Sequence, residues 1–143
     1  MNILGVTTIA IAVYKVLKEI CLNKDLEGID SSKIFIDYLL EDKGQEYKTI
    51  KSIVTRRIET IIKDCKRFKI GKTGYPDQRI SNYSNYSAMY LLCHSDDRAT
   101  IEVLEAYYNQ KYCEHQRCDN QRVGSAGIMT NKYNDYYLYI VVD

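Results

Sequence analysis

The chain has 143 residues, which is enough for one domain with a substantial core or for one domain with an appendage. Its 45% hydrophobic and 27% charged content is ordinary for a globular protein and argues against wholesale disorder. The net charge is only +1, but residues 48–79 hold 10 basic and 3 acidic groups and so carry +7. Such a segment is typical of proteins that bind phosphate groups, although a solvated lysine-rich helix face is an equally good interpretation.

The N-terminal part, residues 1–66, is predicted to be a small helical bundle. Apolar residues at helical spacing predict one helix over 3–22, and the possible cap at 30–32 predicts a second over 33–41. The run at 3–17 is too short for a confident membrane span, so a buried helix is preferred over a membrane anchor. A third helix, over 46–66, is indicated by one apolar stripe: Ile50, Ile53, Val54, Ile58, Ile61, Ile62 and Cys65.

From Arg67 onward the pattern changes to strands alternating with helices. Strands are predicted over 68–72, 88–93 and 136–142, helices over 76–86 and 98–112, and a long loop over 113–135. This order predicts an α+β domain over residues 67–143, built on a small sheet. The N-terminal helices would brace this domain or bind protein partners.

The five cysteines are widely spaced and odd in number. This favours free thiols in a reducing, intracellular compartment over a disulfide framework. Cys113, His115 and Cys118 are zinc-ligand types, but their spacing matches no common zinc motif, so free thiols and a surface histidine are the preferred interpretation.

The sequence RFKIGKTGYPDQR (67–79) joins the first of these strands to the following helix. Gly71 and Gly74 give the backbone freedom for a tight turn, and Pro76 suits the first helical position. Arg79 then falls in the first turn of the helix, with Tyr83 one turn later. A basic turn followed by an arginine-bearing helix predicts a phosphate-binding site.

The sequence KIGKT (69–73), with Arg79 eight residues after Gly71 and Tyr83 four residues further on, resembles the GIY-YIG nuclease superfamily. It is most similar to the phage- and virus-encoded branch, and the resemblance covers about residues 67–112. It implies a small antiparallel sheet flanked by helices, a virus-encoded protein, and a metal-dependent endonuclease that hydrolyses DNA.

The resemblance also implies roles for individual residues. Arg79 would bind and polarise the scissile phosphate, and Tyr83 would contact the nucleophilic water. Glu105 would hold Mg²⁺ or Mn²⁺, with Glu102 as the reserve choice. The residues that would bind the substrate are Lys69, Lys72 and Thr73.

Two features depart from the family pattern. No Gly-Ile-Tyr strand precedes Lys69, and Lys69 itself stands where the second motif has tyrosine. One hypothesis is that the C-terminal strand takes the place of the missing Gly-Ile-Tyr strand and returns Tyr136, Tyr137 or Tyr139 to the site. Of these three, Tyr137 is predicted to be the catalytic tyrosine. The alternative is a catalytically inactive derivative that acts as a structural or interaction protein in a viral particle or nucleoprotein assembly.

Overall fold

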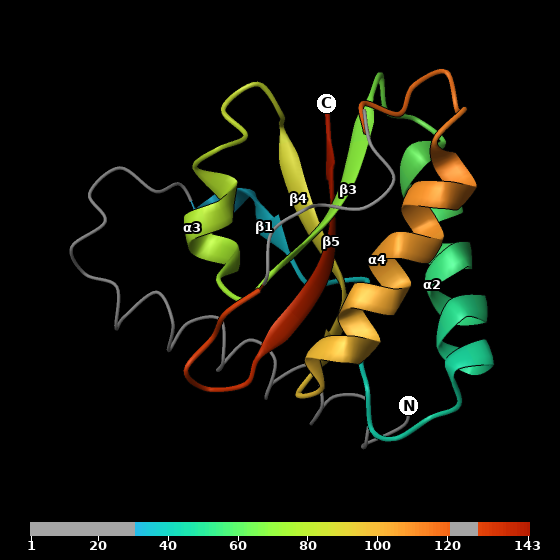
Figure 1. Cartoon of the computed structure of the whole chain (residues 1–143). Helices are drawn as coiled ribbons and strands as arrows, with labels where there is room; N and C mark the ends of the chain where they lie inside the picture. The colour runs from blue at the N-terminus through green and yellow to red at the C-terminus, as the bar shows by residue number, and fades with distance from the viewer. Residues whose placement is uncertain (1–30, 121–128) are drawn as a thin grey trace.

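The computed structural model describes residues 31–120 and 129–143. Within these residues, five strands form one mixed sheet between two layers of helices (Figure 1). The strands are β1 (Ile34–Phe35), β2 (Leu40–Glu41), β3 (Phe68–Thr73), β4 (Ala88–Ser95) and β5 (Tyr136–Val142). The helices are α2 (Tyr47–Ile62), α3 (Pro76–Ile80) and α4 (Arg98–Tyr112), with a 3₁₀ turn at Ser31–Lys33.

The C-terminal strand β5 lies at the centre of the sheet. It pairs antiparallel with β3 on one side and with β4 on the other. The short strands β1 and β2 both pair parallel with the far edge of β4. Six of the seven residues of β5 are buried, which explains why its sequence is a continuous apolar run rather than an alternating one.

Each face of the sheet has its own hydrophobic core. The face covered by α2 and α4, here called the α4-side core, includes Ile50, Val54, Ile58, Phe68, Ile70, Leu104, Tyr108, Leu138 and Ile140. The face covered by α3, the α3-side core, consists of Leu39, Ile80, Met89, Leu91, Tyr137, Tyr139 and Val141. Successive side chains of β5 therefore point to opposite faces of the sheet, as the pleat of a strand requires.

Helix α2 packs against α4 and belongs to the α4-side core. The Tyr108 hydroxyl donates to the Lys51 carbonyl oxygen at 2.9 Å, and the Tyr112 hydroxyl donates to Glu59 at 2.5 Å. The boundary predicted after residue 66 falls between α2 and β3. Residues on both sides of that boundary contribute to one sheet and one core.

Two predictions about the N-terminal part and the sheet are wrong. Residues 33–41 do not form a helix but supply β1 and β2, and the sheet is therefore mixed rather than antiparallel. The physical reason is the long strand β4: β5 pairs with only one of its edges, and the extended segment satisfies backbone groups on the other. The predicted helix over 3–22 lies outside the described residues.

The other element predictions hold, with differences at the ends. Strand β5 and helix α4 have the predicted bounds, and α2 occupies most of the predicted 46–66. Helix α3 ends at Ile80, six residues earlier than predicted, and turns follow it. Ser81, Asn82, Ser84 and Asn85 follow directly, and such side chains compete with helical hydrogen bonds.

The outer edge of β3 is closed by residues 117–120. Phe68 donates its N–H to the Arg117 carbonyl oxygen at 2.9 Å, and Asp119 donates to the Phe68 carbonyl oxygen at 2.7 Å. The Asn120 side chain accepts from the Ile70 N–H and donates to the Ile70 carbonyl oxygen. This edge is thereby protected from pairing with another chain as far as Ile70.

In the described part of the chain, no helix is both long and apolar enough to cross a membrane. The apolar run at 3–17 lies outside that part. The four described cysteines, Cys65, Cys93, Cys113 and Cys118, are free thiols. Burial is the main cause that raises the pKa of the Cys93 thiol to about 12, so it stays protonated near neutral pH and is a poor nucleophile.

Candidate functional site

The two glycines of the motif each allow a close approach by another segment. Gly71 lies opposite Tyr139 in the pairing of β3 with β5, and the Tyr139 phenol occupies the space that a Gly71 side chain would need. At Gly74, a side chain would collide with the Thr130 carbonyl oxygen, and the Asn131 side chain donates to the Gly74 carbonyl oxygen. Both positions thus require glycine for packing, and the first of them admits a tyrosine from β5.

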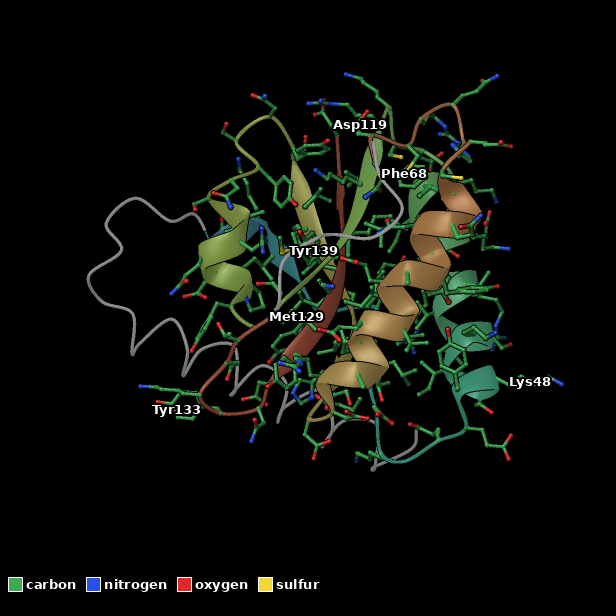
Figure 2. All side chains as sticks on the ribbon, viewed as in Figure 1. Lys48, Phe68, Asp119, Met129, Tyr133 and Tyr139 are labelled. Atoms are coloured by element: carbon green, nitrogen blue, oxygen red, sulfur yellow. The ribbon has the colours of Figure 1, made fainter. Side chains whose placement is uncertain are left out.

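A pair of tyrosine hydroxyls lies at the centre of the candidate site. The Tyr83 and Tyr139 oxygens are 2.6 Å apart, and the two rings meet edge to face with centroids 5.8 Å apart. Tyr139 is only 2% exposed and lies near the middle of the sheet (Figure 2). Tyr83 is half-buried, and the Lys69 ammonium lies 5.9 Å from its ring centroid. Strand β5 therefore brings a tyrosine to the motif.

The pKa of the Tyr139 phenol depends on its burial and on the charges of nearby groups. Burial is the main cause that raises the pKa of the Tyr139 phenol well above its usual value, and Tyr83 raises it further. The positive charge of Arg79 lowers the pKa of this phenol, and the negative charge of Glu105 raises it. Arg79 is exposed on α3. Tyr83 thus contacts Tyr139 directly, whereas Arg79 and Glu105 act on it only through their charges.

Lys72 and Glu105 form a buried ion pair on the opposite face of β3. Lys72 follows Phe68 and Ile70 in the alternation of the strand and so faces α4. Its ammonium is 3.6 Å from Glu105 Oε1, and the two side chains are only 9% and 2% exposed. The candidate residues are therefore divided, with Arg79 and the tyrosine pair on the α3 side and the ion pair on the α4 side.

The remaining predicted residues have other surroundings. Thr73 is buried, and its hydroxyl accepts the Tyr75 N–H at 3.0 Å, which stabilises the turn into α3. Tyr137 is fully buried with its ring centroid 4.9 Å from that of His94. Glu102, the reserve metal ligand, pairs with Arg98 at 3.7 Å.

Tyr139, and not Tyr137, is the β5 tyrosine that contacts Tyr83. Both tyrosines are candidates from the sequence, but the strand register that decides between them cannot be read from it.

The surroundings of Glu105 do not suit a magnesium ion. Mg²⁺ requires octahedral oxygen ligands at about 2.1 Å and usually keeps several waters. The Glu105 carboxylate is almost fully buried and already has an ammonium against one oxygen. In residues 31–120 and 129–143, no three His, Cys, Asp or Glu side chains are grouped so as to hold a metal ion.

A second cluster of titratable side chains, which no sequence motif indicates, surrounds His94. His94 on β4 has Nδ1 2.5 Å from Glu41 Oε2 and Nε2 2.8 Å from Asp135 Oδ1. All three side chains are buried or nearly so. They come from β2, from β4 and from the segment before β5, and only the fold brings them together. The sequence predicts a helix at Glu41 and a loop at Asp135, and neither prediction brings these residues near His94.

The buried tyrosines predict cooperative unfolding at alkaline pH. Burial is the main cause that raises the pKa of Tyr86, Tyr108, Tyr112 and Tyr139 above the ordinary value of 10. The folded state therefore keeps protons that the unfolded state releases, and the free energy of unfolding decreases as the pH rises above about 10. Circular dichroism and tyrosinate absorbance should change together; full tyrosinate absorbance in a chain with native dichroism would contradict this expectation.

The chain was compared with protein-family models, with curated proteins and with solved structures, and none of these three comparisons gave a match.

Proposed function

We propose that this chain is an endonuclease-like protein that binds the phosphodiester backbone of DNA at Arg79 and hydrolyses it. The observation that supports this proposal best is the Tyr83–Tyr139 hydroxyl pair, which lies within electrostatic reach of Arg79. The pair supplies tyrosine hydroxyls on the side of the sheet that α3 and Arg79 cover, although no Gly-Ile-Tyr strand precedes Lys69. Each of these side chains comes from a different segment, which is a common arrangement in catalytic sites.

Arginine suits the phosphate-binding role because its planar guanidinium donates two parallel hydrogen bonds and stays charged at working pH. Arg79 is exposed, so a phosphate group in solution can reach it. Lys69, half-buried beside the Tyr83 ring, adds a second positive charge on the same side of the sheet. Together they favour a phosphodiester over a neutral ligand.

The tyrosine pair would orient the attacking water. Because the pKa of Tyr139 is raised, this phenol stays protonated and acts as a hydrogen-bond partner rather than as a strong base. In the hydrolysis, the water oxygen forms a bond to phosphorus while one ester P–O bond breaks. The water loses a proton to solvent, and the departing oxygen gains one.

A second candidate function is DNA binding without hydrolysis, in a structural or interaction protein. The observation that favours it is the Lys72–Glu105 ion pair, which occupies the carboxylate that would otherwise hold the catalytic metal. Lys69, in the place of a tyrosine, favours it as well. Both candidates share the phosphate-binding side of the site and differ only in turnover.

A nicking assay on supercoiled plasmid separates the two candidates. We expect nicking by the full chain with Mg²⁺, with Mn²⁺ or with EDTA present, and its loss in Arg79→Ala. Glu105→Ala tests whether the carboxylate participates, and Arg56→Ala, an exposed arginine on α2, is the matched control. No nicking under any of these conditions, or nicking that survives Arg79→Ala, would exclude hydrolysis at this site.

A further inference from the structure

We propose that Lys72 is the resident cation of this site, so that phosphate groups bind at Arg79 and Lys69 without a divalent metal ion. The ammonium takes the position on Glu105 that the resemblance assigns to Mg²⁺. The pairing of Lys72 with Glu105 follows from their geometry, and the binding of phosphate rests on the proposed function.

The fold holds Lys72 and Glu105 against each other. On β3, Lys72 lies on the same face as Phe68 and Ile70, which is the face that α4 covers. Glu105 lies on the buried side of α4 beside Leu104. Their charged atoms are 3.6 Å apart in a region that water scarcely reaches. A carboxylate buried without a counter-charge is strongly unfavourable, so the Lys72 ammonium stabilises the folded chain at this position.

A divalent ion and the Lys72 ammonium cannot share this carboxylate. An ion bound at about 2.1 Å from Glu105 Oε1 would lie within a few ångströms of Nζ, where like charges in a weakly screened environment repel strongly. The ion would also have to shed most of its water, because only 2% of the Glu105 side chain is exposed. The Lys72 ammonium carries a single charge and reaches the carboxylate through an apolar stem, so it loses less hydration free energy than a divalent ion would.

The pairing also changes what a phosphate group meets. Lys72 neutralises Glu105, so the carboxylate does not repel an anion that approaches Tyr139. Arg79 is exposed, and Lys69 is half-buried near Tyr83; both are on the α3 side, so the charge that faces the ligand is positive. A phosphodiester can then bind with no metal ion to bridge it to the protein.

The metal half of the proposal is tested by titrating the ¹⁵N-labelled full chain with Mn²⁺ and following paramagnetic broadening of amide signals. We expect no selective broadening at Glu105 in the wild type or in Glu105→Gln. Lys72→Ala should gain it, because the truncation removes the ammonium and opens space beside Glu105 for an ion and its waters. Lys48→Ala, at an exposed lysine at the start of α2, is the matched control and should behave as the wild type (Figure 2).

Selective broadening at Glu105 in the wild type that disappears in Glu105→Gln would overturn the proposal. A folded Lys72→Ala that gains no broadening would overturn it too, because the lysine would then not be what keeps metal away. If Lys72→Ala does not fold, the comparison of wild type with Glu105→Gln decides by itself.

The phosphate half is tested by fluorescence anisotropy with a labelled 20-base-pair DNA duplex, in EDTA and in Mg²⁺ at matched ionic strength. We expect the same affinity in both buffers and a loss of at least about tenfold in Arg79→Ala. Tighter binding with Mg²⁺ that is abolished by Glu105→Gln would overturn the proposal. Absence of DNA binding in both buffers would remove the proposed function, and with it the phosphate half, while the Mn²⁺ titration would still decide between lysine and metal.

Discussion

Replacing His94 with leucine is expected to lower the free energy of unfolding by about 3–5 kcal/mol, the usual effect of removing one partner from a buried charged pair. The imidazole lies between two carboxylates, at 2.5 Å from Glu41 and 2.8 Å from Asp135. Leucine preserves much of the volume but donates no hydrogen bond. Two carboxylates would then remain in a site where His94 itself is only 3% exposed.

The two contacts of the imidazole explain the size of the effect. Each ring nitrogen of His94 lies within hydrogen-bonding distance of a carboxylate oxygen, so leucine removes both contacts at once. Other groups around His94 are the Tyr137 ring and Asp42, whose N–H donates to the His94 carbonyl oxygen.

Urea unfolding followed by circular dichroism measures this loss at neutral pH. Asp135→Asn is the matched control, because its amide oxygen can still accept the Nε2 proton, and we expect a loss of less than about 1 kcal/mol. Equal effects of the two substitutions would show that the volume of the site, rather than its charge pairing, determines stability.

Arg79→Lys is expected to weaken DNA binding by about tenfold, because lysine keeps the charge but cannot donate two parallel hydrogen bonds to one phosphate. Arg79→Ala should weaken it further, since it removes the charge as well. Arg79 is exposed and its side chain is outside both hydrophobic cores, so neither change should alter folding. Fluorescence anisotropy at several salt concentrations measures both quantities.

The salt dependence separates charge from geometry. Each phosphate neutralised by a lysine or arginine contributes about −0.9 to the slope of log affinity against log salt. Arg79→Lys should keep the wild-type slope, and Arg79→Ala should reduce it by about one contact. An Arg79→Lys chain that binds as tightly as the wild type would mean that Arg79 acts only as a diffuse charge, and Arg56→Lys provides the reference for an arginine away from the site.

Much of the fold could be predicted from local patterns. The apolar stripe of α2, the periodicity of α4 and the apolar run of β5 each identify their element, because each pattern records which face is buried. The helix prediction for residues 33–41 is wrong because a capping sequence and a short apolar run fit a helix as well as an extended edge segment. That choice depends on whether β4 has a free edge, which is a property of the sheet and not of the segment.

The motif at 69–79 and the basic segment that leads into it can be recognised without a structure, as can the candidate residues Arg79, Tyr83 and Glu105. Which of these side chains meet depends on how the whole sheet is assembled. The register of β3 against β5 places Tyr139 over Gly71, and the alternation of β3 sends Lys72 to Glu105 on the other face. Pairing register and strand order are long-range properties set by burial on both faces of the sheet, and no local pattern contains them.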